Sequence, residues 1–379
     1  MPFEFATASR VIFGEGAAAT LPELARTLGA RPLVVTGASG ERASALVSAL
    51  SAQTFAVSGE PTVDLVREGA RRAQDAACDV VISLGGGSVI DAGKAIAAIA
   101  TNGGEPLDFL EVVGKGLTLA VPPLPFIAVP TTAGTGSEVT RNAVLGSTQH
   151  GVKASMRSPL MLPRIALVDP ELTYALPPSV TASTGLDALT QLIEPYVSSR
   201  ANPLVDPLCV DGIPRVAGAL RRAYRDGADK QARHDMALAS LFGGLALANA
   251  GLGVVHGFAS PLGGSWKAPH GALCAALLPH GMAANIVALR ARAPRHPALQ
   301  RYSVIARLLT GREDAVAEDG MDWVRALCLD LVVPPLRAWG ITAADLPAVV
   351  ENASRASSMK ANPLPLTGEE LLGIVTAAL

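Results

Sequence analysis

Short apolar runs alternate with helical patterns through the first half of this 379-residue chain. Three runs consist mainly of Val, Ile and Leu and lie beside glycine or proline, namely residues 33–36, 79–84 and 125–130. Continuous apolar runs of this length are typical of strands buried on both faces of a parallel sheet. Helices are predicted around them at residues 41–52, 61–77 and 89–100. The alternation predicts an α/β domain with a Rossmann-like open parallel sheet and helices on both faces.

The pattern changes near Pro177 and Pro178, after a last predicted strand at residues 165–170. Downstream, helical patterns dominate at residues 180–198, 207–225, 230–250, 298–309, 321–331 and 368–378. We therefore expect an α/β domain at residues 1–178, followed by an all-helical domain at residues 179–379. Stretches rich in glycine, proline and serine at 103–124 and 146–164 are predicted loops that line the cleft between the two domains.

Composition limits the class of protein. The chain is 49% hydrophobic and its net charge is −2, so it has ample material for a core and no feature that points to a nucleic-acid or membrane partner. Four cysteines form no CxxC pair and are predicted free thiols of a reducing compartment. The first residues lack a signal-peptide pattern, and apolar runs such as 95–100 are too short to cross a bilayer. A cytoplasmic protein is expected.

Two glycine-bearing turns follow predicted strands. Residues 85–88 read Gly-Gly-Gly-Ser and precede a helix, whose free N–H groups and positive dipole end suit an anion. Taken alone, this could equally be a tight strand–helix turn. Residues 131–137 contain four hydroxyl side chains and two glycines, a composition that suits contacts to phosphate, ribose or nicotinamide. Two such turns after adjacent parallel strands predict a nucleotide at the carboxyl ends of the strands.

A candidate metal site is spread over the second half. Asp187 and Gln191 are four residues apart, so they share one face of a predicted helix. His256 and His270 follow later and are the best candidate imidazole ligands among the six histidines. A carboxylate with imidazoles suits a divalent ion such as Zn or Fe. The amide of Gln191 is a weaker, neutral ligand.

Taken together, these motifs resemble the iron-containing (group III) alcohol dehydrogenase family, which includes maleylacetate reductases and is related to dehydroquinate synthases. The match runs nearly end to end, through residues 11–16, 85–94, 130–139, 167–170, 185–194 and 256–285. The resemblance implies a dehydroquinate synthase-like fold. It places NAD or NADP on the first domain, Fe or Zn with the substrate on the second, and the nicotinamide facing the metal across the cleft.

The resemblance also implies which residues bind the cofactor. The pyrophosphate would contact Gly86, Gly87 and Ser88. The remaining positions expected at the cofactor are Gly37, Asp91, Thr131, Thr132, Ser137 and Lys153. At Gly37, many NAD-preferring relatives have an acidic residue for the ribose 2′-OH. The glycine removes a carboxylate that would repel a 2′-phosphate, which makes NADP plausible.

Two positions depart from the family pattern GxDAxxHxxE and the segment that follows. Gln191 stands where the family has a histidine ligand, and Ser260 stands where it often has a proton-relaying histidine. One reading has Asp187, Gln191, His256 and His270 all coordinating a metal. In the other, no metal binds and the two histidines orient the substrate. The first is favoured because three of the four ligands persist, and Glu194 is expected to support the site rather than act as a base.

The resulting functional hypothesis is an NAD(P)-dependent oxidoreductase that interconverts a small alcohol and an aldehyde or ketone. Catalysis would use His256 and His270, with water, Ser260 or His270 as the proton route. Alternatives are a maleylacetate reductase-like enzyme, a dehydroquinate synthase-like lyase, and a nucleotide-binding relative with weakened or lost catalysis. The resemblance further implies a homodimer, in which β-segments near residues 1–16 pair across the two copies.

Overall fold

The computed structural model describes residues 2–266 and 268–379, which form two compact units. The sheet unit comprises residues 6–132 and 136–173, and the helical unit comprises residues 2–5, 133–135 and 174–379. The main change of unit, between Thr173 and Tyr174, lies a few residues before the expected boundary at 178/179. In addition, the helical unit takes in two short segments of the first half of the chain. Each unit is described by itself below.

The sheet unit is built on six parallel strands in the order β1-β8-β5-β4-β2-β3. Their bounds are Arg10–Phe13 (β1), Pro32–Gly37 (β2), Gln53–Val57 (β3), Val80–Gly85 (β4), Phe126–Pro130 (β5) and Ile165–Val168 (β8). Every pairing in this sheet is parallel. The predicted open parallel sheet is confirmed. Among its strands, only β3 has no counterpart in the sequence prediction, which ended a helix at residue 52.

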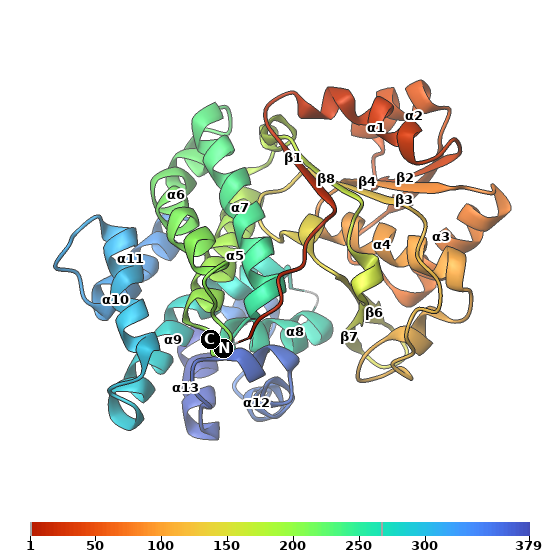
Figure 1. Cartoon of the computed structure of the whole chain (residues 1–379). Coiled ribbons are helices and arrows are strands. Elements are labelled where there is room, and N and C mark those ends of the chain that lie inside the picture. The colour runs from red at the N-terminus through yellow and green to blue at the C-terminus, as the bar shows by residue number, and fades with distance from the viewer. Residues whose placement is uncertain (1, 267) are drawn as a thin grey trace. The chain divides into compact units, whose positions relative to one another are not determined.

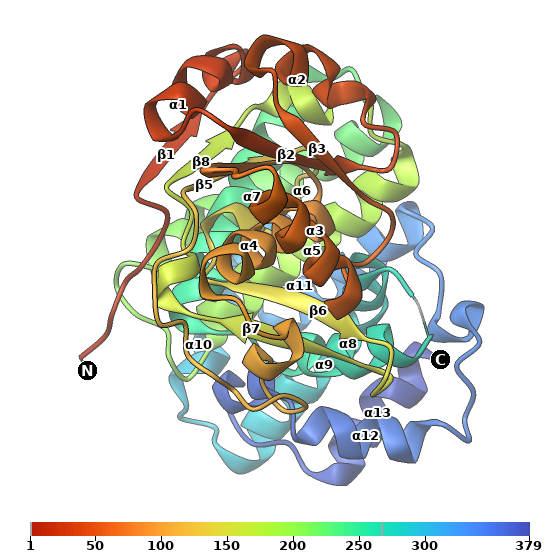
Figure 2. The same cartoon turned by 90° about the vertical axis from the view of Figure 1, so that its right-hand side faces the viewer.

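Alternate side chains of the central strands feed two separate cores, one on each face of the sheet. Leu33, Val35 and Val81 pack with helices α3 (Val63–Asp75) and α4 (Gly87–Asn102). Val34 and Ile82 pack with α1 (Leu21–Leu28) and α2 (Ser44–Leu50). Figures 1 and 2 show these two pairs of helices on opposite sides of the sheet. Because both faces are covered, the strands are apolar along their whole length.

An antiparallel hairpin occupies part of the segment that was predicted to be a loop at residues 146–164. Its strands are β6 (Asn142–Ser147) and β7 (Val152–Arg157). Side chains on one face alternate into the core beside α4, and these are Ala143, Leu145, Ala154 and Met156. The loop prediction was wrong here because glycine, serine and lysine on the outward face masked the period-two pattern.

The helical unit contains nine α-helices among its described residues. Their bounds are Pro178–Val197 (α5), Asp206–Arg225 (α6), Lys230–Ala250 (α7), Val254–Trp266 (α8), His270–Arg292 (α9), Pro297–Thr310 (α10), Ala317–Asp330 (α11), Leu346–Ser354 (α12) and Gly368–Ala378 (α13). By length and composition α9 could span a membrane, but 78% of its most apolar stretch is buried inside the protein. It therefore has the character of a core helix, and the predicted helical second part of the chain is confirmed.

Candidate active site

Helix α5 carries the first candidate ligands. All residues of α5 from Gly185 to Val197 are buried, and Asp187 is 1% exposed. Gly185 allows α5 to approach α6 closely, since a Cβ at this position would lie 2.3 Å from the side chain of Leu220. The carboxylate of Asp187 is therefore held inside the helical unit by close helix packing and is shielded from bulk water.

Three further ligand atoms meet the carboxylate of Asp187. They come from His256 on α8 and from His270 and Cys274 on α9, and the four ligand atoms lie within 4.8 Å of one another. Asp187 Oδ1 is 3.4 Å from His256 Nε2 and 3.8 Å from His270 Nε2. The thiol of Cys274 is 3.6 Å from His270 Nε2. The structure thus brings together three of the four predicted metal ligands and adds a cysteine.

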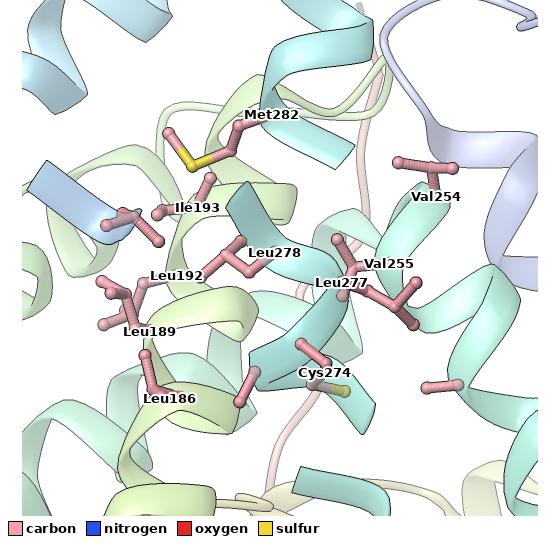
Figure 3. Packing of buried hydrophobic residues seen from close by; sticks show 14 of the residues in the cluster. Leu186, Leu189, Leu192, Ile193, Val254, Val255, Cys274, Leu277, Leu278 and Met282 are labelled. Atoms are coloured by element: carbon pink, nitrogen blue, oxygen red, sulfur yellow. The ribbon is translucent and has the colours of Figure 1, made fainter. Parts of the chain in front are cut away.

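Apolar side chains form the surroundings of this cluster. Figure 3 shows Leu186 and Leu189 of α5, Val255 of α8, and Cys274 and Leu277 of α9 within one packed core. Gly271 lets the first turn of α9 approach α5, because a Cβ there would lie 2.4 Å from a backbone carbonyl oxygen of that helix. Such surroundings strengthen electrostatic interactions at the cluster, since little polarisable solvent competes with them.

Two buried atoms of the cluster, and one on Gln191 one helical turn after Asp187, have no hydrogen-bond partner. These atoms are Asp187 Oδ1, Gln191 Oε1 and His256 Nε2. Leaving buried polar groups unpaired is costly, by about 1–3 kcal/mol for each group. A divalent cation bound to them would remove that cost. A carboxylate and imidazole nitrogens are suitable donors for iron or zinc, so the side chains present fit a metal.

Glu194 fixes the orientation of one imidazole. Its Oε2 lies 2.7 Å from His256 Nδ1, and its Oε1 accepts a 2.7 Å hydrogen bond from the backbone N–H of Val255. Gly253 leaves room for this carboxylate, since a Cβ there would lie 2.9 Å from Glu194 Oε1. A carboxylate at Nδ1 keeps the proton on that nitrogen and leaves Nε2 free to bind a metal. This contact is the supporting role expected for Glu194.

The pKa shifts at the cluster show that its negatively charged groups stabilise positive charge at this position. Burial would lower the pKa of His270, but Cys274 and Asp187 offset it and raise that pKa to about 9. Burial likewise opposes the charged form of His256, yet Cys274, Asp187 and Glu194 hold its pKa well above the ordinary value. For Asp187, burial raises the pKa, and the two imidazoles reverse the shift so that its pKa is lowered.

The other two residues predicted for this site lie nearby on the same helices. Gln191 follows Asp187 by one turn of α5, and its amide oxygen lies against Gly243 of α7, 3.5 Å from where a Cβ would stand. Ser260 follows His256 by one turn of α8 and is half-buried. Gln191 Oε1 is buried without a hydrogen-bond partner, and the assignments of Gln191 and Ser260 to the site stay predictions.

In the sheet unit, the two predicted turns are neighbours. Gly85 at the end of β4 is in register with Pro130 at the end of β5, and Thr131 N–H donates a 3.0 Å hydrogen bond to the carbonyl of Gly85. A Cβ on Gly86 would lie 3.3 Å from the side chain of Thr132. Helix α4 begins at Gly87, so its first N–H groups face this narrow space. A bare backbone beside a helix N-terminus fits the phosphates of a dinucleotide.

Asp91 and Ser137 were predicted to contact the cofactor, and the structure gives both of them partners inside the sheet unit. Asp91 Oδ1 accepts a hydrogen bond from the Ser137 hydroxyl, and Oδ2 accepts one from the Val144 N–H at 2.9 Å. The ammonium group of Lys94, which is 1% exposed, lies 3.4 Å from Asp91 and donates to the Ser137 and Thr140 carbonyls. These hydrogen bonds and the ion pair hold Ser137, and with it the end of the second turn, in place.

The remaining predicted cofactor residues lie at the ends of strands. Gly37 ends β2, and a Cβ at this position would meet nothing within 4 Å. Lys153 lies on β7, and its ammonium group is 3.4 Å from a carboxylate oxygen of Glu60. Neither observation tests a cofactor contact, so both assignments stay predictions.

Two functional side chains were missed in the sequence. Cys274 was interpreted only as a buried thiol, although its spacing of four from His270 placed both on one helix face. Lys94 was noted only within a motif, and its burial could not be foreseen from a single charge in the apolar pattern of residues 89–100. The only signal in each case was the spacing from a neighbour on the same helix, four residues for Cys274 and His270 and three for Lys94 and Asp91. The other contacts come from segments far away in the sequence.

Comparison with known proteins places this geometry in a family. The model of "Iron-containing alcohol dehydrogenase" matches residues 8–170, and that of "Fe-containing alcohol dehydrogenase family, C-terminal" matches residues 181–379. Alcohol dehydrogenase 4 of Schizosaccharomyces pombe is 40% identical over 324 residues, which cover 85% of this chain and 74% of that protein.

Solved structures agree with these matches. A crystal structure of 1,3-propanediol oxidoreductase is 33% identical with a TM-score of 0.91, and the match covers 100% of both chains. Sulfoacetaldehyde reductase from Bifidobacterium kashiwanohense, solved in complex with NAD+, is 29% identical with a TM-score of 0.87, covering 100% of this chain and 99% of that one. The family uses NAD(P) and iron, for which the turns and the ligand cluster provide fitting groups. The resemblance seen in the sequence is confirmed, and the chain belongs to the iron-containing alcohol dehydrogenase family.

Proposed function

We propose that this chain is an NAD(P)-dependent dehydrogenase that interconverts a small alcohol and an aldehyde or ketone at a metal held by its helical unit. The observation that carries the proposal is the convergence of Asp187, His256 and His270, where Asp187 Oδ1 and His256 Nε2 are buried without a hydrogen-bond partner. Supporting it, the relatives described above are named as an alcohol dehydrogenase, a propanediol oxidoreductase and an aldehyde reductase.

The sheet unit binds the cofactor in this proposal. The backbone at Gly86, Gly87 and Ser88 holds the pyrophosphate at the start of α4, and Thr131 and Thr132 contact the ribose and nicotinamide part. Glycine at this turn permits close approach of the backbone to the phosphates.

The remaining assignments in the sheet unit concern specificity and support. Gly37 leaves open space at the end of β2, which accommodates a 2′-phosphate as well as a 2′-OH. Asp91 and Ser137 act by fixing the second turn through Lys94. Lys153 is retained as a contact to the ribose or the substrate, and its ion pair with Glu60 orients the ammonium group.

The helical unit supplies the chemistry of the carbonyl group. A divalent metal bound by Asp187, His256 and His270 would supply Lewis-acid polarisation of the carbonyl oxygen. Asp187 and His256 hold it from the buried side, with Glu194 keeping the proton of His256 on Nδ1. The side chain of His270 is 38% exposed, so His270 can also exchange a proton with water. Ser260 offers a hydroxyl group one helical turn after His256 on α8. Gln191 lies one turn after Asp187 on α5.

A cofactor-oxidation assay tests the proposal. Purified protein is supplied with Fe(II) or Zn(II) and with NADH or NADPH, and the loss of absorbance of the reduced cofactor is followed with small aldehydes, ketones and maleylacetate. We expect oxidation with an aldehyde or ketone. Oxidation with maleylacetate alone would replace the proposal by the reductase alternative. Tight binding of a reduced cofactor with no oxidation by any carbonyl compound would overturn it in favour of a non-catalytic relative.

We also propose a cytoplasmic homodimer. Strand β1 is an edge strand of the six-stranded sheet, and Val11 on it is 38% exposed, so its outer edge is available for pairing with a second copy. The four cysteines are free, which suits a reducing compartment. Light scattering after gel filtration measures the mass. A monomeric mass at micromolar concentration would contradict the dimer, and Val11→Pro is expected to shift a dimer towards monomer.

A further inference from the structure

We propose that Cys274, as a thiolate, is the fourth protein ligand of the metal in the helical unit, and that the resulting set of one carboxylate, two imidazoles and one thiolate selects zinc over iron. The inference deepens the proposed function, because it concerns the metal on which that function depends. The substrate oxygen would then bind as a fifth ligand, since catalytic zinc sites can expand from four to five ligands. Gln191, which stands at the histidine position of the sequence motif, is then not a ligand.

Distances between the ligand atoms support a tetrahedral site. With metal–nitrogen and metal–oxygen bonds of about 2.0 Å and a metal–sulfur bond of about 2.3 Å, tetrahedral geometry separates N from O by about 3.3 Å and S from N by about 3.5 Å. His256 Nε2 and Asp187 Oδ1 are 3.4 Å apart. Cys274 Sγ and His270 Nε2 are 3.6 Å apart. Asp187 Oδ1 and His270 Nε2, at 3.8 Å, are slightly farther apart than this geometry requires, so a small movement of His270 would complete the site.

The thiol of Cys274 differs from the other free thiols of the helical unit. Cys274 is fully buried and is directed into a cluster of ligand atoms, two of which have no hydrogen-bond partner. Cys328 instead donates to the carbonyl of Ala275 at 3.5 Å. Cys209 is fully buried in the apolar core, where burial raises its pKa. Cys274 alone among these three has ligand atoms of other side chains as its neighbours.

The position of Cys274 on α9 explains how it reaches the site. His270 is the first residue of α9, and Cys274 follows one turn later on the same face. Two helices therefore each contribute a pair with a spacing of four, Asp187 and Gln191 on α5 and His270 and Cys274 on α9. On α5 the second member lies against Gly243 of α7. On α9 the second member lies in the cluster.

Charge and softness decide which metal the set prefers. Binding releases the thiol proton and one proton from each of the two imidazoles to solvent as the bonds to the metal form, and no electron is transferred. The charges of Asp187 and the thiolate then balance that of a divalent cation within the ligand set, which lowers the cost of burying it, and the carboxylate of Glu194 adds one negative charge beside His256. A thiolate is a soft ligand that favours zinc, whereas a neutral amide oxygen such as that of Gln191 contributes little affinity.

Cobalt substitution tests the thiolate ligand by spectroscopy. Metal-depleted wild-type protein is titrated with Co(II), and we expect one equivalent to bind with a near-ultraviolet thiolate-to-cobalt charge-transfer band. Cys274→Ala should lose this band and weaken Zn(II) binding by more than the roughly 10–100-fold that removal of an outer contact costs. Cys209→Ala is the matched control, since it also removes a fully buried thiol of the helical unit, and it should keep both properties.

Gln191→Ala separates the two candidate fourth ligands. The inference requires that this variant keep the charge-transfer band and bind one Co(II). If Gln191→Ala loses the metal while Cys274→Ala keeps it, the inference is wrong and the amide is the ligand. A rescue variant adds a second readout: Gln191→His in the Cys274→Ala background should recover metal binding without recovering the band.

X-ray absorption of the zinc-loaded wild-type protein makes the test independent of how well the variants fold. One sulfur neighbour at about 2.3 Å is expected beside nitrogen and oxygen neighbours at about 2.0 Å. A shell containing only nitrogen and oxygen would overturn the inference and leave the metal-dependent proposed function standing. Absence of stoichiometric binding by Co(II), Zn(II) and Fe(II) would instead remove the metal from the proposed function, so the two failures are distinguishable.

Discussion

The two glycine-bearing turns of the sheet unit and the ligand cluster of the helical unit are built in opposite ways. The turns present backbone: Gly86 and the start of α4 offer N–H groups, and their support, Lys94 with Asp91, lies behind them. The cluster presents side chains, and two of its four ligand atoms, Asp187 Oδ1 and His256 Nε2, have no hydrogen-bond partner. A backbone site is defined by a few consecutive residues, whereas a side-chain site depends on three helices packing correctly. Substitutions should therefore affect the two regions differently.

The largest effect is expected from Asp187→Asn. It keeps the shape of the side chain but removes the charge that balances a cation beside His256 and His270. Metal content should fall, and kcat should fall by roughly 10²–10³-fold. Metal analysis and cofactor oxidation measure the two quantities. Asp211→Asn, at an ion pair with Arg215 on α6, is the control and should change neither. Full metal content with normal kcat in Asp187→Asn would show that the helical cluster does not depend on this carboxylate.

A pH-dependent effect on stability is expected in the sheet unit. Burial raises the pKa of Glu138 to about 7 from an ordinary value of 4.5, although the nearby Lys94 opposes the shift. The unfolded chain ionises first, so the free energy of unfolding should decrease as pH rises from about 4.5 to 7, by about 3 kcal/mol from this group.

Glu138→Gln should remove that slope in denaturant melts at several pH values. Glu60→Gln, which replaces a more exposed carboxylate, should retain it. If the slope survives in Glu138→Gln, Glu138 is not the titrating group, and the support behind the second turn is less buried than described.

An intermediate effect is expected from Glu194→Gln. An amide offers one acceptor, so it cannot serve both the Val255 N–H and His256 Nδ1 as Glu194 does. Either the imidazole loses its orientation or its proton moves to the nitrogen that binds metal. Metal affinity should weaken by about 10–100-fold, measured by competition with a chelator. Unchanged affinity would show that helix packing alone orients His256.

The smallest effect is expected from Gly37→Asp. The added side chain has open space, so it should not disturb folding, and its carboxylate would repel a 2′-phosphate. The ratio of kcat/KM for NADPH to that for NADH should fall by about 10-fold, or about 1.4 kcal/mol. Gly218→Asp, on α6 and also in open space, should leave the ratio unchanged. An unchanged ratio in Gly37→Asp would place the 2′ position elsewhere.

The same contrast explains what could be predicted from the sequence. Strands β2, β4, β5 and β8 were predicted because each is a continuous apolar run between breakers, and the two turns followed from their position after adjacent strands. The expected loop at 146–164 was wrong because the short hairpin strand β7 has no continuous apolar run. Its alternation of buried and more exposed residues was masked by polar residues on the outward face. The apolar pattern of the sequence was thus informative for strands that are buried on both faces, and not for the hairpin.

The metal cluster was predictable only in part. Asp187 was found because it lies one turn before Gln191 on a predicted helix, and His256 and His270 were found among only six histidines, at the spacing of the family that the sequence resembles. Cys274 was not identified as a ligand, because a cysteine between Leu273 and Ala275 is as hydrophobic as an ordinary core residue. No helix was predicted at α9, whose residues are apolar around the whole circumference and so lack the period of 3.6. The contact between Cys274 and the other ligands could not be seen without that helix.

The burial of α9 has a consequence for biosynthesis. In the finished chain α9 is covered by α5 and α8, which precede it, and by α11 and α13, which follow it. When α9 leaves the ribosome, α11 and α13 are not yet available, so the side of this very apolar helix that they cover in the folded protein is exposed. Chaperone demand should therefore peak at this stage of translation. A premature stop codon before Gly368 should leave the protein in inclusion bodies, whatever the state of its ligand residues.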